Sequence, residues 1–494
     1  MAITGPTPAR RGAPLLTALL LLVSCTGSPP VSEDRTRVTV GGAPSALARR
    51  LTEAVTVPGI RRHQRALQRI ADRSHGNRAA GLPGYRRSVR YVVTRLLQAG
   101  YRVSYARVRI ETWAEARPTT LAPAEPAGTD LVNGRDFSLM AYSGGGVMTE
   151  RVTPVDRADD SSGCEPDDFD GFPAGDIALV DGASCPYLIQ ADNAEAAGAG
   201  AVVVAAPRTA GGPAPLFPGT LGSDAEVTIP VVSASEAAGA SLGRLAEEGA
   251  GLRVSAGVVR GMRPARSVVA ERPGAADKVV MAGAHLDSVG GGPGINDNGS
   301  GAATILEMAL RLARLDPDTR NGVRFAFWAA EEEGLLGSTA YIRGLRAAER
   351  DDIALYLNFD MLGSPNFVRF VYAVAAPGPV TPYELGTAAV EARFARYFGQ
   401  RDLATEPLPL EGGSDHAAFS AAGIPVGGLF SGAEGIKSRS EAEDFGGSAG
   451  EPYDPCYHLA CDTIGNNSNL GLGQLADAAT HAVGVYADQP DPPS

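Results

Sequence analysis

The chain has 494 residues, enough for two or three domains, and 44% hydrophobic and 20% charged residues are ordinary for a globular protein. Its 61 glycines and 36 prolines predict long and numerous loops. The net charge of −12 argues against nucleic acid or anionic lipid as the main partner, because an acidic surface repels phosphates.

The first 25 residues predict an export signal that is not part of the fold. Two arginines precede an apolar run, Leu15 to Val23, which is too short to span a bilayer but suits the central segment of a secretory signal. The run ends in Leu-Val-Ser-Cys, which resembles a bacterial lipobox. We therefore expect a lipoprotein signal peptide over residues 1–25, lipidation at Cys25 and a flexible tether over residues 26–45. A plain signal peptide with an incidental cysteine is the alternative.

The chain has five cysteines, and an odd number in an exported protein demands an explanation. If Cys25 carries lipid, four remain, and they fall into two local pairs. Oxidising conditions outside the cytoplasm permit a larger loop between Cys164 and Cys185 and a small one between Cys456 and Cys461.

The first predicted element is a helix, because Val89, Val92, Val93, Leu96 and Leu97 recur at helical spacing. A glycine at position 100 ends this helix, and an alternating strand follows. From about residue 125 to 260 the chain is rich in Gly, Ala and Pro. A strand, a turn, a helix of small residues and the strand Ala201–Ala205 predict a compact inserted module there.

Beyond residue 265 strands and helices alternate. The expected strands are Lys278–Ala282, Val323–Trp328, Ile353–Phe359 and Ile424–Phe430, and the expected helices are Ala302–Leu315, Leu335–Ala348 and Pro382–Phe398. This alternation predicts an α/β fold in which helices flank a mainly parallel or mixed sheet. We expect a catalytic domain of residues 46–124 and 261–488 with an inserted domain at residues 125–260.

Acidic and imidazole groups follow three of the expected strands. His285 and Asp287 follow the first, Glu331–Glu333 the second and Asp360 the third. Ligands of open α/β sheets bind beyond the carboxyl ends of the strands. A buried acidic cluster is costly unless a cation neutralises it. The stretch "AHLDSVGGGPGINDNGSG" at 284–301 therefore predicts metal ligands on a loop whose glycines permit tight turns.

Histidine nitrogen combined with carboxylate oxygen favours zinc, and also admits cobalt or manganese. Asp297 in the same loop can offer one oxygen to each of two metals, which in binuclear sites lie about 3.5–4 Å apart. One further histidine is needed. The three histidines in charged or helical contexts are expected at the surface or in the core, which leaves His416 and His458. Whether the chain also binds a calcium ion is open, and the sequence indicates no position for one.

Seven motifs now support a resemblance to a known family. They are "AHLDSV", "GINDNGSG", "FWAAEEEGLLGS", "YLNFDMLGSPN", "GGSDHAAF", "GIPVGGLFSGA" and "CYHLACD". Over most of residues 265–485 the chain is similar to the secreted metallo-aminopeptidases of peptidase family M28, the family of the aminopeptidase of Streptomyces griseus. The stretch "GNRAAGLPGYRRSVRYVVTRLLQAGY" is similar to the N-terminal helix of that family. The insert resembles a β-rich protease-associated (PA) domain through "GDIALVDGASCPY" and "AAGAGAVVVAA".

The resemblance implies a zinc-exopeptidase fold with two zinc ions. The five implied ligands are His285 and Asp360 for one ion, Glu332 and His458 for the other, and Asp297 as the bridge. The three consecutive glutamates are ambiguous by spacing alone, and the "GLLGS" that follows them identifies the first as the base and the second as a ligand.

The resemblance also implies that Glu331 is the general base and that Tyr457 donates a hydrogen bond to the developing oxyanion. Some relatives carry an arginine just before "SDHA", where this chain has Gly413. The preference for the first side chain, by default large and apolar such as leucine, is therefore open.

Together these features predict an exported, monomeric zinc aminopeptidase that acts on peptides with a free N-terminus and touches a membrane only through Cys25. Two alternatives remain: a carboxypeptidase or dipeptidase on the same scaffold, and a catalytically inactive surface ectodomain. The first needs a basic group to hold a substrate carboxylate, and the ligand motifs contain no arginine. The role of the PA domain, as an access element, a docking element or a spacer, is also open.

Overall fold

The computed structural model describes residues 45–493 apart from short gaps at 125–130, 157–161, 183–184, 208–213, 218, 223–224, 316–317, 375–380 and 411. The expected signal peptide, the lipidation site Cys25 and all but the last residue of the expected tether lie outside the described residues. Within the described part, no helix is both long and apolar enough to cross a membrane.

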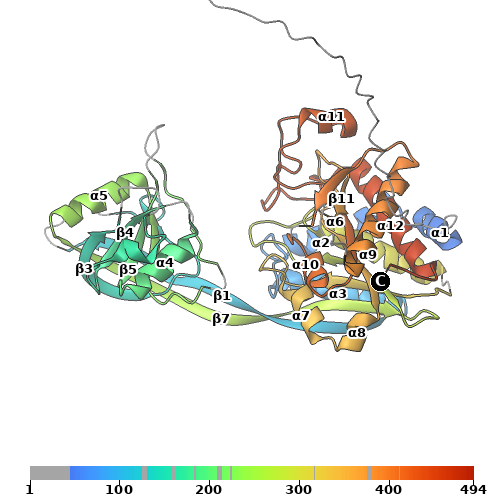
Figure 1. Cartoon of the computed structure of the whole chain (residues 1–494), viewed down its shortest axis with the longest axis horizontal. Coiled ribbons are helices and arrows are strands. Elements are labelled where there is room, and N and C mark those ends of the chain that lie inside the picture. The colour runs from blue at the N-terminus through green and yellow to red at the C-terminus, as the bar shows by residue number, and fades with distance from the viewer. Residues whose placement is uncertain are drawn as a thin grey trace, which may run out of the picture. The chain divides into compact units, whose positions relative to one another are not determined.

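A mixed sheet organises the part of the chain after residue 265 (Figure 1). Its strands are β7 (Gly251–Arg272), β8 (Val279–His285), β9 (Gly322–Trp328), β10 (Ile353–Phe359), β11 (Phe370–Ala373), β12 (Glu406–Pro409) and β13 (Val426–Phe430). Across the sheet the order is β12-β11-β13-β10-β8-β9-β7. Strands β9, β8, β10 and β13 are parallel, and β7 is antiparallel to β9. The expected mixed sheet is confirmed.

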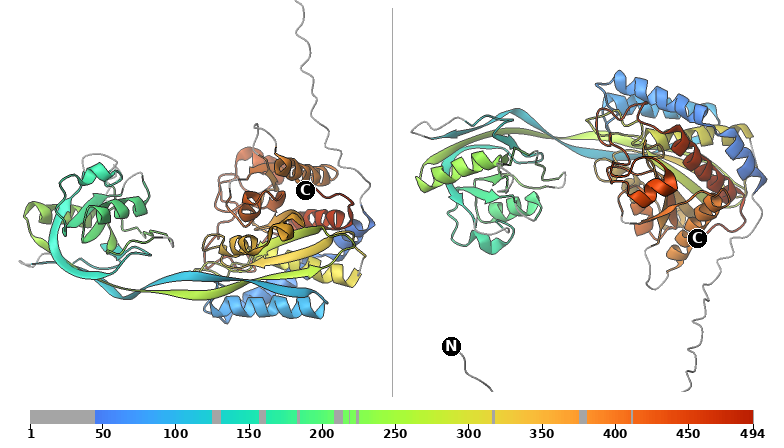
Figure 2. Two further views of the ribbon diagram at one scale, coloured as in Figure 1. Left: turned by 60° about the horizontal axis from the view of Figure 1, so that its bottom comes forward. Right: turned by 90° about the horizontal axis from the view of Figure 1, so that it is seen from above.

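Side chains alternate along each strand between two hydrophobic cores, one on each face of the sheet. On β9, Phe325 and Phe327 join the larger core, and Ala326 and Trp328 join the smaller one. The larger core is packed by α1 (Ala46–Ala54), α2 (Val57–Asp72), α3 (Pro83–Gln98), α6 (Gly299–Leu315), α9 (Pro382–Gly399) and α12 (Asn469–Asp488). The smaller core is packed by α7 (Leu336–Gly344) and α10 (His416–Ala421). Helices thus cover both faces, as expected (Figure 2).

The single helix expected over Leu335–Ala348 is wrong, because the structure divides it into α7 and a short helix α8 (Ala347–Asp351). Gly344, a weak helix former, ends α7, and Leu345 is extended with φ −81° and ψ 140°. The carboxylate of Glu349 then accepts a hydrogen bond from the backbone N–H of Arg346 at 2.9 Å, which caps the new helix. After β13 the chain forms one further short helix, α11 (Arg439–Phe445).

The Gly- and Ala-rich part forms strands β2 (Phe137–Leu139), β3 (Gly146–Pro154), β4 (Ile177–Asp181), β5 (Ala201–Ala205) and β6 (Val231–Ala234). Strands β3 to β6 are parallel, with η1 (Pro166–Phe169) before β4. Helices α4 (Tyr187–Ala196) and α5 (Glu236–Glu247) pack into two different cores. The predicted unit of strand, small-residue helix and strand is β4–α4–β5. The expected disulfide between Cys164 and Cys185 is present in this part.

Two strands of 22 residues each run through both parts of the chain. β1 (Arg102–Pro123) and β7 are antiparallel and hydrogen-bonded along their length. At its start β7 also pairs with β3, through residues 251–256, and at its end it pairs with β9, through residues 268–272. The boundary expected after residue 260 falls inside β7, so continuous strands connect the two parts at that point.

Candidate metal centre

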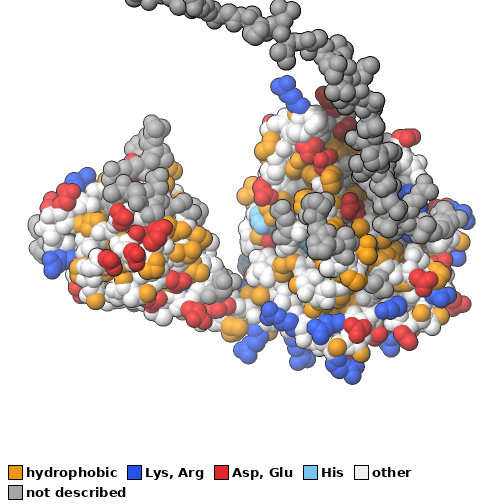
Figure 3. Space-filling model, in the orientation of Figure 1, with side chains coloured by type: hydrophobic (Ala, Val, Ile, Leu, Met, Phe, Trp, Pro, Cys, Tyr) orange, Lys and Arg blue, Asp and Glu red, His pale blue; other side chains and the backbone are white. Residues whose placement is uncertain are grey.

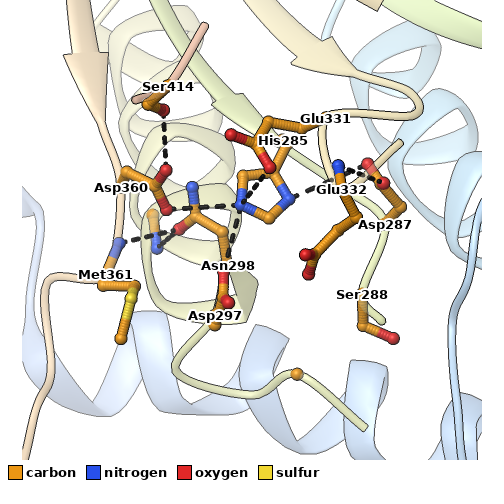
Figure 4. Close-up of polar contacts among 12 residues, drawn as sticks. His285, Asp287, Ser288, Asp297, Asn298, Glu331, Glu332, Asp360, Met361 and Ser414 are labelled. Carbon is orange, nitrogen blue, oxygen red and sulfur yellow. Dashed lines mark hydrogen bonds and ion pairs between the residues drawn. The ribbon is translucent and has the colours of Figure 1, made fainter. Parts of the chain in front are cut away.

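Parallel strands β8, β9 and β10 end at one edge of the sheet, and the polar residues that follow them meet there. His285 is the last residue of β8, Asp360 directly follows β10, and Glu331 and Glu332 follow β9 after two intervening residues. In Figure 4 the carboxylates of Asp360, Glu331 and Asp297 surround the imidazole of His285. The expectation that distant stretches of the chain converge here therefore agrees with the geometry.

The first cluster surrounds the Nε2 atom of His285, a side chain that is 1% exposed. This nitrogen lies 3.1 Å from Asp297 Oδ1 and 3.3 Å from Asp360 Oδ1. Glu331 Oε2 is farther, at 3.9 Å. Two groups of residues here could each hold a metal ion, because the ligand atoms within each group lie within 4.8 Å of one another: His285 with Glu331 and Asp360, and His285 with Asp297 and Glu332.

The second cluster surrounds the Nε2 atom of His458. It lies 3.2 Å from Asp297 Oδ2 and 3.1 Å from Glu332 Oε2. Asp297 therefore turns one carboxylate oxygen to each histidine and joins the two clusters. The third glutamate, Glu333, belongs to neither cluster, and its Oε1 lies 3.8 Å from Arg263 Nη2.

Charge within the two clusters favours a cation. Burial alone would lower the pKa of His285, but the charges of Asp360 and Glu331 outweigh it and hold that pKa well above its usual value. For His458 burial is likewise outweighed, chiefly by the hydrogen bond with Asp297, and the pKa rises to about 10. The carboxylates around each imidazole thus favour a positive charge, and a metal ion could supply that charge in place of a proton.

Two buried carboxylate oxygens give a further sign of a missing partner. Among the described residues, Glu332 Oε1 has no hydrogen-bond partner, and Asp360 Oδ1 has none besides its ionic contact with His285. A buried acceptor without a partner costs about 1–3 kcal/mol. Imidazole nitrogen with carboxylate oxygen is a donor set that zinc accepts. The residues present therefore fit a metal ion at each cluster.

The glycine-rich loop between β8 and α6 is fixed by Arg78, whose side chain is fully buried. Its guanidinium donates hydrogen bonds to the carbonyls of Pro293, at 2.8 Å, and of Leu286 and Gly294. Gly294 has φ +59°, and a Cβ atom there would lie 2.2 Å from the carbonyl oxygen of Asp297. A glycine is therefore required where this loop approaches the bridging residue.

Two groups that orient the cluster residues were not predicted from the sequence. The carboxylate of Asp462 accepts hydrogen bonds from the backbone N–H groups of Asn296, at 2.8 Å, and Asp297, at 3.0 Å. The hydroxyl of Ser414 donates to Asp360 Oδ2 at 2.7 Å. Both residues lie inside motifs that carry the family resemblance, "CYHLACD" and "GGSDHAAF". Their place in these motifs is the sequence feature that could have identified them.

His458 is presented by a short loop that the expected disulfide between Cys456 and Cys461 closes. Within it the rings of Tyr457 and His458 stack with centroids 3.8 Å apart. His458 has φ +58°, and such left-handed backbone in a residue other than glycine costs about 1–3 kcal/mol. Strain of this kind gathers at functional sites.

A cavity of about 220 Å³ opens onto both histidines and Tyr457. Its apolar lining is formed by Met361, Tyr372, Leu408, Pro409, Phe430 and Ala433. His416 also lines it and packs its ring 4.7 Å from that of Tyr372, but it joins neither cluster. Of the two histidines left open by the sequence, His458 is therefore the one that completes the centre.

The other three histidines lie away from the centre, as expected. His63 is buried and contacts the carboxylate of Glu307 at 3.0 Å and the hydroxyl of Tyr91 at 2.7 Å. His481 packs against an aromatic ring, and His75 is exposed.

The fold and the paired clusters define an α/β protein with a candidate metal centre at the carboxyl ends of its parallel strands. A model of peptidase family M28 matches residues 267–483, and a model of the PA domain matches residues 148–242. An aminopeptidase of Pseudomonas aeruginosa is 42% identical over 422 residues, which cover 83% of this chain and 77% of the relative. A probable lipoprotein aminopeptidase of Mycobacterium tuberculosis is 39% identical over 490 residues, covering 96% and 94%. The chain belongs to peptidase family M28 and carries a PA domain.

Solved structures show the same fold. An aminopeptidase from Aneurinibacillus sp. strain AM-1 aligns with a TM-score of 0.68 and 23% identity, over 90% of this chain and 97% of that one. A zinc aminopeptidase from Bacillus subtilis aligns with a TM-score of 0.63 and 23% identity, over 88% and 96%. The expected fold class, an α/β peptidase domain with a PA domain, is confirmed, and so is the expected enzyme class.

Proposed function

We propose that the chain is a zinc-dependent aminopeptidase that removes the N-terminal residue from peptides at a centre of two metal ions. The observation that carries this proposal is the placement of Asp297, which turns one oxygen to His285 and the other to His458. Asp360 and Glu332 supply the further carboxylate of each cluster. The names of the relatives, aminopeptidases and leucine aminopeptidases, support the same reaction.

In this proposal His285 and Asp360 hold one zinc ion, Glu332 and His458 hold the other, and Asp297 bridges them. When bound, the two ions supply Lewis-acid activation of the scissile carbonyl and of a water molecule. A calcium ion is an additional candidate without an assigned place.

The remaining chemistry belongs to the side chains. Glu331 accepts the proton of the attacking water and passes it to the leaving amine. Its carboxylate lies 3.9 Å from His285 Nε2, beside the proposed ligands. Burial and the charge of Asp297 raise the pKa of Tyr457, so its hydroxyl stays a donor for the developing oxyanion. One such donor is worth about 3–4 kcal/mol. Glu331 and Asp360 are placed to hold the free α-ammonium of the substrate.

The cavity beside the centre suits a large apolar first side chain such as leucine, because Met361, Tyr372, Leu408 and Phe430 line it. Gly413 also lines this cavity, and a Cβ atom there would meet nothing within 4 Å. The site therefore has open space where some relatives carry an arginine.

Leucine p-nitroanilide and its N-acetyl form test the reaction when assayed with and without a chelator. We expect cleavage of the free substrate only, loss of activity with the chelator, and about two zinc ions per chain by elemental analysis. Equal cleavage of the two substrates would reject an aminopeptidase. A carboxypeptidase would instead cleave N-blocked peptides with a free C-terminus.

We further propose that residues 46–124 and 261–488 form the catalytic domain, that residues 125–260 form the PA domain, and that the exported chain is a monomer anchored at Cys25. The name of the mycobacterial relative, a probable lipoprotein, supports the anchor. Cys25→Ala should move the protein from the membrane fraction to the soluble fraction. Unchanged membrane retention would contradict lipidation, and free secretion of the unaltered chain would favour a plain signal peptide.

A further inference from the structure

An open groove of about 760 Å³ lies between α3 and the paired strands β1 and β7, and the proposed mechanism leaves it without a role. Apolar side chains line it: Val89, Val93, Val108, Met262, Pro264 and Ala265. All of its charged lining residues are arginines: Arg86, Arg90, Arg107, Arg109 and Arg266. Figure 3 shows Lys and Arg side chains gathered along the lower edge of the peptidase part, while the whole chain carries a charge of −12.

These arginines lack carboxylate partners. All five are exposed, and no described carboxylate lies within ion-pair distance of any of them. Arg107 and Arg266 stand directly opposite each other in the register of β1 and β7, a position in which like charges repel. Arg86 donates a hydrogen bond to the carbonyl of Gly81, and Arg266 lies over the ring of Tyr105 at 4.5 Å. Arginines without carboxylate partners around an apolar floor complement a ligand that is both acidic and apolar.

Strand β7 connects the groove with the loop that carries the candidate metal ligands, although Arg263 itself does not line the groove. Met262 and Pro264 line the groove, and Arg263 between them lies 3.8 Å from Glu333. Glu333 directly follows Glu332, one of the proposed ligands. An extended peptide advances about 3.3 Å per residue. A substrate whose first residue sits at the centre must therefore cross β7 to bring later residues to the arginines.

We propose that this groove is an exosite for the downstream part of peptide substrates, selective for acidic side chains placed among apolar ones a few residues after the N-terminus. This inference rests on the proposed aminopeptidase function. Guanidinium groups pair with carboxylates in a fixed two-pronged geometry, and the apolar floor accepts the neighbouring side chains. Binding at the groove raises the effective concentration of the scissile bond at the centre. A membrane of anionic lipids would also attract arginines, but the contact beside Glu333 favours a peptide.

The test compares the heptapeptide Leu-Ala-Gly-Glu-Phe-Glu-Ala with its counterpart in which both Glu are Gln. In the unaltered enzyme at low salt we expect kcat/KM to be about five- to tenfold higher for the acidic peptide, since an exposed ion pair is worth roughly two- to fivefold. The difference should lie in KM. It should disappear near 1 M salt, where the Debye length is about 3 Å. It should also disappear in Arg107→Gln/Arg266→Gln.

Two controls accompany this variant. Arg320→Gln/Arg343→Gln makes the same change in net charge at exposed positions that do not line the groove, and it should keep the preference. Leucine p-nitroanilide is too short to reach the groove, so its kcat/KM should be the same in all three proteins. Fluorescence anisotropy of the labelled, N-acetylated acidic peptide measures binding at the groove without any turnover.

Several results would overturn the exosite. Equal kcat/KM for the two peptides, or an equal loss in the control variant, would do so. Binding to phosphatidylglycerol vesicles that is lost in Arg107→Gln/Arg266→Gln, with both peptides treated alike, would assign the arginines to a membrane. Aggregation of that variant without a change in KM would mean that the arginines only protect the edge of β1 from strand pairing. Inactivity toward leucine p-nitroanilide would instead reject the proposed function, while the anisotropy still tests the groove.

Discussion

Replacing Glu331 by Gln separates the proposed base from the proposed ligands. Glu331 Oε2 lies 3.9 Å from His285 Nε2, farther than the 3.1 and 3.3 Å of Asp297 and Asp360 from the same nitrogen. Gln keeps the size of the side chain and removes the oxygen that accepts a proton. General acid–base catalysis contributes about 10²–10⁴ in rate, or roughly 3–5 kcal/mol at 1.36 kcal/mol per tenfold. We expect kcat to fall by that factor while the zinc content stays unchanged.

The assay is steady-state cleavage of leucine p-nitroanilide together with elemental analysis of each variant. Glu332→Gln should lose metal as well as activity, because the Glu332 carboxylate lies 3.1 Å from His458 Nε2. Glu333→Gln is the matched control, and it should change kcat by less than about fivefold, because Glu333 faces Arg263. Loss of zinc in Glu331→Gln would make Glu331 a ligand, and normal turnover in that variant would place the base elsewhere.

Of three further predictions, two concern the support of the centre and one concerns the stability of the fold. Asp462→Asn should weaken zinc binding about 10- to 100-fold, because it weakens the hydrogen bond that the N–H of Asp297 donates to this side chain. Chelator competition measures the affinity, and an unchanged affinity would contradict the positioning role. Burial alone would raise the pKa of Glu307, but hydrogen bonds, first of all with His63, lower it to about 2. Glu307 therefore stabilises the fold above its unfolded pKa of about 4.5, and this contribution is lost as the pH falls toward 2. Glu307→Gln should cost about 2–3 kcal/mol in urea unfolding at pH 7, and the difference from the unaltered protein should shrink below pH 4.5; a difference that is constant with pH would refute this. Gly294→Ala should lower the melting temperature, since it combines a φ of +59° with a clash against the Asp297 carbonyl, and an unchanged melting temperature would mean that the loop relaxes freely.

The sequence predicted the sheet and the elements that carry the ligands because both depend on local patterns. The run Val323–Trp328 is apolar apart from Arg324, as expected for a strand that is largely buried on both faces, and the structure places it inside the sheet. Parallel strands end at one edge, so His285, Asp360 and the glutamates after β9 had to be neighbours once the strands were recognised.

The features that the sequence did not predict depend on contacts between distant residues. The end of α7 is an exception, because Gly344 and the cap from Glu349 to Arg346 set it locally, although apolar residues continue across the break. The length of β1 and β7 is an example, because the domain boundary expected after residue 260 falls inside one continuous strand. Pairing over 22 residues is decided by the partner strand, and no pattern within one strand reveals it.

The contacts that hold the backbone of Asp297 in place at the centre could not be predicted from the sequence either. Its carboxylate can face two histidines only if the backbone of its loop is held from outside the loop. Arg78 holds the preceding carbonyls, and Asp462 holds the N–H of Asp297. These two residues are 384 positions apart in the chain, and both are buried, with 0% and 1% exposure. A buried ion is tolerated only where its partners are in place, so loss of either residue should disturb both clusters together. The two clusters therefore form one structural unit, and their metal sites should weaken jointly rather than one at a time.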